Sequence, residues 1–189
     1  EGFYRFIIAT NYLGDIIRNY FGNGKKFGVE ISYLNEKNPL GTAGALSLVK
    51  DTFLEPVVVT NGDVLTELNY KFIFNYQKEN RADACVALVK EFEKLKYGVV
   101  KVSDGNIVSI EEKPTVSRLV NAGVYVLTPE VISFLKHGET INITTLLSKM
   151  IASGKKIVGY QLHENWSDIG HPKDLENANS VYGEKKNEQ

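Results

Sequence analysis

The segment Val57-Val58-Val59-Thr60-Asn61-Gly62-Asp63 decides how the rest of this sequence is interpreted. A run of β-branched residues ends abruptly in turn residues, which is typical of a buried parallel strand in an α/β sheet. Ligands of such sheets bind just beyond the carboxyl ends of the strands. Gly62 would let a ligand approach the backbone closely, and Asp63 offers an oxygen ligand suited to Mg²⁺. The alternative interpretation is a strand followed by an ordinary turn.

Segments on both sides of this strand alternate between strand-like and helix-like patterns. Before it, a buried strand is expected at residues 4–10 and an alternating strand at residues 29–34. Helices are expected at residues 12–20, capped by Asn11, and at residues 43–53. After it, Asn69 caps a helix that reaches residue 78, and a strand follows at residues 82–89. This order predicts an α/β, Rossmann-like fold with a mixed, mainly parallel sheet flanked by helices.

The pattern changes near residue 97, where three strand-like runs follow one another. They cover residues 97–102, 106–111 and 119–127, and Asp104-Gly105 between the first two is a strong hairpin signal. These runs predict an antiparallel insert. Pro129 then opens a helix to residue 135, a second helix covers residues 143–152 before Gly154, and a last strand covers residues 156–162.

Length and composition limit the class of protein. The 189 residues are 43% hydrophobic and 24% charged, which predicts one globular domain over residues 1–182 with a flexible tail at 183–189. A net charge of −1 gives no footprint for nucleic acid. Cys85 is the only cysteine, so we expect a buried thiol in a reducing, cytoplasmic compartment. No signal peptide or membrane-spanning run is visible, so no membrane partner is expected.

Polar residues beside glycines offer candidate ligands for phosphates and a metal ion. Asp168 follows the last strand within Trp166-Ser167-Asp168-Ile169-Gly170, so it can share one Mg²⁺ with Asp63, or it can cap a helix or turn. The loop Pro39-Leu40-Gly41-Thr42-Ala43-Gly44 opens a helix and can offer free backbone N–H groups to an anion or a base, or can be a plain junction. No GxGxxG segment occurs, which argues against a dinucleotide enzyme.

A second set of candidates lies in and around the antiparallel insert. Lys113 can pair with a phosphate and Glu112 can accept hydrogen bonds from sugar hydroxyls, although solvated surface charges are the alternative. Asn121 lies in an apolar run, so we expect a buried amide whose partners come from the backbone or from a ligand. Gly98 and Gly123 interrupt strands, which often marks the close approach of a ligand or another backbone.

Taken in order, a set of segments resembles the sugar-1-phosphate nucleotidyltransferase family, and its mannose-1-phosphate guanylyltransferase-like members in particular. The segments are NYLGDII, YFGNGKKFGVEISYLNEKNPLGTAGAL, VTNGD, YGVV, IEEKP, NAGVYVL and WSDIG, and they span residues 4–178. The resemblance implies that a sugar 1-phosphate attacks the α-phosphate of a nucleoside triphosphate and releases pyrophosphate. It also implies Mg²⁺ as the cofactor.

The same resemblance implies a role for each candidate residue. Asp63 and Asp168 would hold the metal, and Lys113 would bind the phosphate of the sugar. Nucleotide binding would fall to Leu40, Gly41, Thr42 and Gly62. Sugar binding would fall to Gly98, Glu112, Asn121, Gly123 and Trp166, with Trp166 packed beside Asp168.

The resemblance lacks the front of the family pattern, a strand with a Gly-rich loop and a Pro-Lys-Pro segment. Because the sequence begins Glu1-Gly2-Phe3, we expect a fragment that can still bind a nucleotide sugar but whose turnover is lower by at least ~10²–10³. Two alternatives stay open, a nucleotide-sugar-dependent glycosyltransferase and a non-catalytic regulatory homologue. Against the former, Asp63-Val64-Leu65 supplies only one aspartate of an Asp-x-Asp pair. The base, the sugar and the oligomeric state, homo-oligomers included, stay undetermined.

Overall fold

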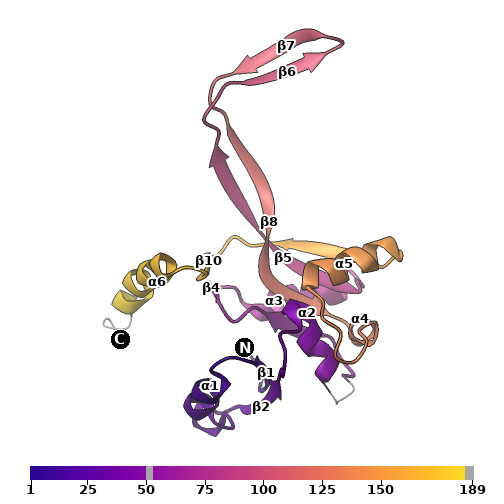
Figure 1. Ribbon diagram of the computed structural model, residues 1–189, viewed down its shortest axis with the longest axis vertical. Coiled ribbons are helices and arrows are strands. Elements are labelled where there is room, and N and C mark those ends of the chain that lie inside the picture. The colour runs from indigo at the N-terminus through magenta and orange to yellow at the C-terminus, as the bar shows by residue number, and fades with distance from the viewer. Residues whose placement is uncertain (50–52, 186–189) are drawn as a thin grey trace. The chain divides into compact units, whose positions relative to one another are not determined.

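The computed structural model describes residues 1–49 and 53–185 and divides into two compact units (Figure 1). The first unit comprises Glu1–Gly62, Asn69–Val86 and Val124–Val158. The second comprises Asp63–Leu68, Ala87–Gly123 and Gly159–Gln189. Each unit is therefore assembled from segments that are distant in the sequence, and each is described separately below.

The first unit begins with a parallel strand pair joined by a helix. Strand β1 (Arg5–Thr10) pairs with β2 (Glu30–Asn35), and α1 (Gly14–Phe21) and the 3₁₀ turn η1 (Lys25–Phe27) connect them. The expected burial of β1 is wrong, because the strand pairs only with β2 within the described chain and most of its side chains are exposed. Asn11 does not cap α1, since its side-chain amide donates to the Glu36 carbonyl at 2.8 Å instead.

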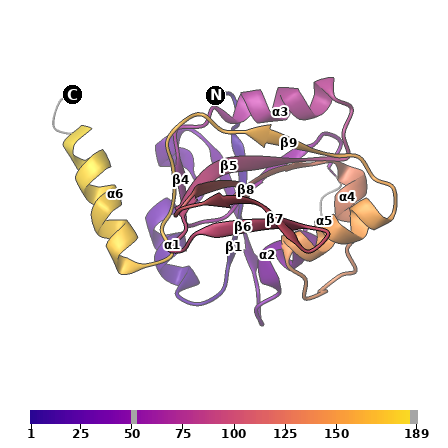
Figure 2. The same ribbon diagram turned by 90° about the horizontal axis from the view of Figure 1, so that it is seen from above.

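The main sheet has the strand order β3-β8-β5-β9. Its members are β3 (Val57–Thr60), β5 (Ala84–Lys94), β8 (Thr115–Leu127) and β9 (Ile157–Gln161), and β5 and β8 run side by side as long strands (Figure 1 and Figure 2). Their buried parts supply much of the core, including Ala84, Cys85, Val124, Val126 and Leu127. The mixed α/β architecture is confirmed, but β3 itself is a half-buried edge strand that pairs antiparallel with β8.

Helices with clear local signals form where the sequence predicts them. Helix α3 (Tyr70–Glu79) is capped by Asn69, whose side chain accepts the Lys71 amide at 3.0 Å. Helix α4 (Pro129–Ser133) has proline at its first position. Helix α5 (Ile143–Ala152) buries a stripe at helical spacing that consists of Ile143, Leu146, Leu147 and Met150. Helices of this first unit are therefore set by caps and apolar periodicity.

One predicted helix of the first unit is much shorter than expected. Instead of a helix over residues 43–53, the chain forms the short helix α2 (Gly41–Gly44) and the 3₁₀ turn η2 (Ala45–Leu48), and Val49 is extended. Residues 50–52 of that prediction lie outside the described residues. The Thr42, Ala43 and Gly44 amides, which the first turn of a helix leaves without intrahelical partners, bond to residues 141–142.

The second unit contains two antiparallel ribbons and the last helix. Strand β4 (Val64–Thr66) pairs with β10 (Trp166–Asp168), and β6 (Val99–Ser103) pairs with β7 (Asn106–Glu111). The predicted hairpin is confirmed, with Asp104 and Gly105 at φ 50° and 80°, whereas β4 and β10 were not predicted. Helix α6 (Pro172–Lys185) includes residues 183–185 of the predicted tail, and residues 186–189 lie outside the described chain.

Within residues 1–49 and 53–185, no helix combines the length and apolar content that crossing a bilayer requires.

Asp83 joins the segment that follows α3 to the segment that precedes β9. Its carboxylate accepts hydrogen bonds from Lys155 Nζ at 2.9 Å and from the Lys156 amide at 2.8 Å. The Lys155 bond is the main cause that lowers the pKa of Asp83 below its ordinary value of 3.8, and the Lys156 amide adds to it. The ionised carboxylate of Asp83 therefore stabilises the fold at pH values above 3.8. This stabilisation disappears as the pH falls through the lowered pKa of Asp83 in the folded chain.

We expect Asp83→Asn to reduce the free energy of unfolding by about 1–2 kcal/mol at neutral pH, because one charged acceptor is lost. Urea denaturation at a series of pH values measures this difference. It should shrink as the pH falls below 3.8, the ordinary pKa of the carboxyl group, and disappear below the lowered pKa of Asp83 in the folded chain. A difference that stays constant down to the acid range would show that the charge of Asp83 does not contribute.

Candidate functional site

The two candidate metal ligands are brought together by a pair of strands that the sequence did not reveal. Asp168 is the last residue of β10 and pairs with Val64, the residue that follows Asp63. The Ile169 amide donates a hydrogen bond to the Asp63 carbonyl at 2.9 Å, which fixes this register beyond the strand ends. Both aspartates are exposed. The second unit therefore holds two solvent-accessible carboxylates on neighbouring backbone segments.

The donor set at this position fits Mg²⁺. Within residues 1–49 and 53–185, no group of three or more His, Cys, Asp and Glu side chains is arranged to hold a metal ion. Mg²⁺ is usually bound through one or two carboxylates together with the phosphates of a substrate. Asp63 and Asp168 match this requirement, because they would leave the remaining coordination positions to phosphate oxygens and water.

Trp166 connects the aspartate pair to the β8 residues that were predicted to bind sugar. Its indole N–H donates to the Ala122 carbonyl at 2.8 Å, between Asn121 and Gly123. The amide oxygen of Asn121 accepts the Gly123 backbone N–H at 3.0 Å. Asn121 is exposed, so the expectation of a buried amide is wrong. The backbone is one of the two partners expected for this amide, and the Gly123 N–H supplies it. The Trp166–Ala122 bond therefore links the part of β8 that contains Asn121 and Gly123 to β10, the strand that ends at Asp168, and these residues form the first cluster.

A second cluster forms at the base of the β6–β7 hairpin. A Cβ atom added at Gly98 would lie 3.0 Å from Glu112 Oε2, so only glycine leaves room for the present position of Glu112. Glu112 also pairs with Lys113, with 3.7 Å between Oε1 and Nζ. Lys113 has φ 46°, a left-handed conformation that is uncommon for a non-glycine residue, and it precedes the buried Pro114. Gly98, Glu112 and Lys113 therefore lie close together, and their predicted roles toward a sugar and its phosphate stay predictions.

The two clusters of the second unit occupy different parts of β8. Lys113 lies two residues before Thr115, where β8 begins, and Asn121 lies six residues after Thr115. An extended strand rises about 3.3 Å per residue, so roughly 20 Å of strand separates the two clusters. In this structure the residues predicted to bind the sugar ring and its phosphate therefore do not surround a single point.

The predicted nucleotide loop belongs to the first unit and is fastened to the segment before α5. The Ala43 and Gly44 amides both donate to the Ile141 carbonyl, at 3.0 and 3.2 Å. The Thr42 amide donates to Asn142 Oδ1 at 3.4 Å, and the Leu40 amide donates to Glu36 Oε2 at 3.1 Å. The expectation that these N–H groups are free for an anion is therefore wrong.

Gly62, the remaining predicted nucleotide residue, has no close neighbour. A Cβ built at this position would have no heavy atom within 4 Å, and the residue is exposed. Its lack of a side chain is therefore not required by packing within the described chain. The open space agrees with the prediction that a ligand approaches the backbone at this point.

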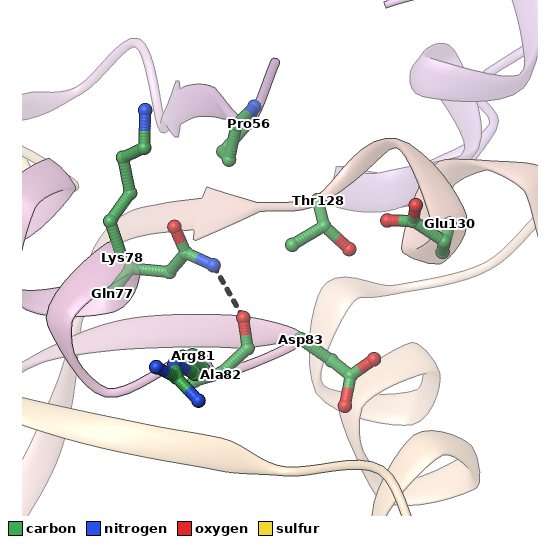
Figure 3. Close-up of a pocket in the computed structure, with 8 residues that line it drawn as sticks. All are labelled: Pro56, Gln77, Lys78, Arg81, Ala82, Asp83, Thr128 and Glu130. Atoms are coloured by element: carbon green, nitrogen blue, oxygen red, sulfur yellow. Dashed lines mark hydrogen bonds between the residues drawn. The ribbon is translucent and has the colours of Figure 1, made fainter. Parts of the chain in front are cut away.

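The first unit also contains a cavity of about 370 Å³ that none of the predicted site residues lines (Figure 3). It lies at the Pro56 end of β3, whereas Gly62 and Asp63 follow the other end of that strand. Gln77 is nearly fully buried there; its Nε2 donates to the Ala82 carbonyl, and its Oε1 has no partner. The cavity is lined by Pro56, Gln77, Lys78, Arg81, Ala82, Asp83, Thr128 and Glu130. We therefore assign it no part in the candidate site.

Residues that support the site were missed because their contacts are non-local. The Asn165 carbonyl accepts the Glu67 amide at 3.0 Å and the Thr66 hydroxyl at 3.1 Å, which secures the β4–β10 ribbon from its other end. The Ile141 carbonyl has the same role for the nucleotide loop. Both act through backbone atoms, so no residue type in the sequence marks them.

Comparison with known protein families identifies the family of this α/β chain. The Nucleotidyl transferase family model matches residues 1–185. The chain therefore belongs to the nucleotidyl transferase family.

Similar curated proteins are mannose-1-phosphate guanylyltransferases. The chain is 32% identical over 183 residues to the mannose-1-phosphate guanylyltransferase catalytic subunit beta of Dictyostelium discoideum, covering 93% of this chain and 51% of that protein. It is 35% identical over 166 residues to the probable mannose-1-phosphate guanylyltransferase 3 of Arabidopsis thaliana, covering 84% of this chain and 50% of that protein. The chain thus spans about half the length of these relatives.

Solved structures show the same fold. HddC from Yersinia pseudotuberculosis superposes with a TM-score of 0.70 at 22% identity, covering 96% of this chain and 80% of that one. A putative glucose-1-phosphate thymidylyltransferase from Bacillus anthracis superposes with a TM-score of 0.69 at 25% identity, covering 93% and 74%. The Rossmann-like α/β prediction is confirmed by these likenesses.

Proposed function

We propose that this chain is part of a sugar-1-phosphate nucleotidyltransferase that makes a nucleotide sugar and pyrophosphate from a sugar 1-phosphate and a nucleoside triphosphate. The observation that supports the proposal is the pairing of β4 with β10, in which Asp168 lies opposite Val64, the neighbour of Asp63 in the sequence. Membership of the nucleotidyl transferase family and the curated relatives support it. Because those relatives are named as mannose-1-phosphate guanylyltransferases, GTP and mannose 1-phosphate are the proposed substrates. The cytoplasm is the proposed compartment, as expected from the single cysteine of the sequence.

The reaction requires positioning more than covalent chemistry. An oxygen of the sugar phosphate, already ionised at neutral pH, forms a bond to the α-phosphorus of the triphosphate. The bond from that phosphorus to the bridging oxygen of pyrophosphate breaks, and pyrophosphate leaves with the electron pair. No protein base is needed for this step, so orientation and charge neutralisation supply most of the rate enhancement.

The proposed roles follow the chemistry of the side chains. Asp63 and Asp168 would hold Mg²⁺, which when bound neutralises phosphate charge. Lys113 would bind the sugar phosphate as a point charge, and Glu112 would accept hydrogen bonds from sugar hydroxyls. Trp166 would keep the β10 backbone in place through its bond to Ala122. The loop that contains Leu40, Gly41 and Thr42 would contact the base.

The proposal is tested by ligand-induced stabilisation with a panel of nucleotide sugars in the presence of Mg²⁺. GDP-mannose, UDP-N-acetylglucosamine, dTDP-glucose and CDP-glucose are compared, because a ligand that binds the native state raises stability as RT ln(1 + [L]/Kd). We expect the largest shift with GDP-mannose, and we expect Asp63→Asn to abolish it. Equal shifts with all ligands, or none, would contradict the proposed substrates.

The product distinguishes this proposal from the glycosyltransferase alternative. A nucleotidyltransferase releases pyrophosphate from a triphosphate, whereas a glycosyltransferase releases a nucleoside diphosphate from a nucleotide sugar. Detection of nucleoside diphosphate alone would overturn the proposal, and nucleotide-sugar binding without any product would favour a regulatory homologue.

Gly98→Ala is expected to weaken nucleotide-sugar binding while leaving binding of the nucleotide alone unchanged. The added Cβ would lie 3.0 Å from Glu112 Oε2, so the carboxylate must move by a few tenths of an ångström. We expect Kd for the nucleotide sugar to rise about threefold to tenfold, which corresponds to ~0.7–1.4 kcal/mol. Isothermal titration with both ligands measures the difference. Equal weakening for both would show that Gly98 acts on the fold and not on the sugar.

A further inference from the structure

The cross-strand pairs of the β4–β10 ribbon do not by themselves specify its register. Register is strongly specified where the paired residues present one apolar, buried face, and weakly specified where they do not. In this ribbon each pair joins an apolar residue to a polar one, and none of the six residues is buried. The pairs are Val64 with Asp168, Leu65 with Ser167, and Thr66 with Trp166. Contacts outside these three pairs must therefore fix the register.

A change of register would alter the candidate metal site. Asp168 now lies opposite Val64, and the Ile169 amide donates to the Asp63 carbonyl at 2.9 Å. A shift by one residue would turn Asp168 to the other face of the ribbon, and a shift by two would move it roughly 7 Å along β4. Mg²⁺ tolerates little variation in the positions of its oxygen ligands. The ability of Asp63 and Asp168 to share one ion therefore depends on the register.

The hydroxyl group of Thr66 joins the two strands at the end of the ribbon remote from Asp63. It donates to the Asn165 carbonyl at 3.1 Å and accepts the Leu68 amide N–H at 3.1 Å. Leu68 is 2% exposed, so the hydroxyl connects the residue before β10 to a buried position after β4. Trp166, in contrast, bonds β10 to Ala122 of β8 and does not hold β4.

Asn165 and Glu67 strengthen the same end of the ribbon. The Glu67 amide donates to the Asn165 carbonyl at 3.0 Å, and Asn165 Nδ2 donates to Glu67 Oε2 at 2.9 Å. Backbone bonds can re-form in a shifted register, because every residue here offers the same N–H and C=O groups. The side-chain bonds of Thr66 and Asn165 join particular residues, so they favour the present register over a shifted one.

We propose that Thr66 is a positioning residue of the candidate metal site. Its hydroxyl, supported by the Asn165–Glu67 bond, fixes the register of β4 and β10 and so sets the position of Asp168 relative to Asp63. Its effect on the site is indirect, since Thr66 pairs with Trp166, two positions along the ribbon from Asp168. This inference rests on the proposed function, because it takes Asp63 and Asp168 as the ligands of Mg²⁺.

Thr66→Val is the decisive variant, because it keeps the branched shape of the side chain and removes the hydroxyl. Thr66→Ser restores the hydroxyl and should restore the wild-type behaviour. Thr115→Val is the matched control. Thr115 begins β8 in the same unit, is exposed, and its hydroxyl has no hydrogen-bond partner within residues 1–49 and 53–185.

Two measurements on the complete chain separate register from metal binding. Hydrogen exchange followed by NMR reports the Ile169 N–H, which lies at the metal end of the ribbon. We expect Thr66→Val to raise its exchange rate about tenfold, because two hydrogen bonds of the ribbon are lost. Electron paramagnetic resonance measures binding of Mn²⁺, which prefers the same oxygen ligands as Mg²⁺. We expect Thr66→Val to raise the Kd of Mn²⁺ at least about fivefold, and Thr66→Ser and Thr115→Val to change both quantities less than about threefold.

The outcomes distinguish this inference from the proposed function. An Ile169 exchange rate that is the same in Thr66→Val and the wild type overturns the inference. Faster exchange with unchanged Mn²⁺ affinity overturns the positioning role, and an equal increase at all amides of the second unit shows a general loss of stability instead. A wild-type chain that binds no Mn²⁺ contradicts the metal site of the proposed function and the positioning role with it, whereas the exchange rates still decide whether Thr66 fixes the register.

Discussion

Replacing Asp63 by Asn is expected to lower Mg²⁺-dependent pyrophosphate release by about 10²–10³-fold, because half of the carboxylate charge that would hold the metal is lost. Asp168→Asn should have an effect of the same size if both carboxylates hold the ion, since Asp168 lies opposite Val64, the residue that follows Asp63. Both side chains are exposed, so neither change should reduce the free energy of unfolding by more than about 0.5 kcal/mol. A coupled assay for pyrophosphate measures the rates.

The double variant makes this prediction sharper. If Asp63 and Asp168 hold one ion, the second substitution should reduce the rate by less than about tenfold beyond the first, because residues that act as a unit are not additive. Asp15→Asn is the matched control, since Asp15 is exposed on α1 in the first unit. Independent, multiplying losses would falsify a shared metal ion, and a wild-type rate for either single variant would exclude that residue as a ligand.

Gly44→Val is expected to reduce the free energy of unfolding by about 2–4 kcal/mol and to abolish nucleotide binding. A Cβ at Gly44 would lie 2.4 Å from the Glu139 carbonyl oxygen and 2.6 Å from Leu40 Cβ. The first contact involves backbone, which cannot move away without breaking the bonds that fasten the loop at Ile141. Leu40, which would contact the base, is displaced by the second contact. Urea denaturation and nucleotide titration measure the two effects.

Gly62→Ala separates folding from binding at the other predicted nucleotide position. No heavy atom lies within 4 Å of a Cβ at Gly62, so stability should change by less than about 0.5 kcal/mol. Nucleotide affinity should still fall, because the methyl group occupies the space that a ligand would use.

If Gly44→Val left stability unchanged, the close contact of the loop with residues 139–141 would not exist in solution.

The sequence predicted those elements whose signals are local. Asn69 as a cap, Pro129 at a helix start, the Asp104-Gly105 turn and the apolar stripe of α5 each act within a few residues. Burial of β1 and β3 was predicted from apolar runs alone, and it failed because burial depends on which strands pair with them. Strands β4 and β10 were missed because each is three residues long and is stabilised by a partner far away in the sequence.

The same contrast between local signals and contacts with distant segments applies to the candidate site. Asp63 and Asp168 could be selected from residue type and position, but their proximity depends on the β4–β10 register. Gly98 and Glu112 lie close together because the hairpin between them is a local structure, whereas Asn121, predicted for the same sugar, lies further along β8. The N–H groups of the nucleotide loop were wrongly expected to be free, since the sequence does not indicate that Ile141 accepts two of them. Physical signals that involve only the backbone of a distant segment are invisible in a single sequence.

Cys85 gives the protein a built-in reporter of transient opening. The residue lies in β5 within the first unit and is fully buried, and it is the only cysteine of the sequence. A thiol-modifying reagent can reach it only when the surrounding strands separate, so the rate of alkylation under native conditions measures the free energy of that separation. Mass spectrometry of the alkylated chain can therefore rank substitutions throughout the first unit without denaturant, added probes or any enzymatic assay.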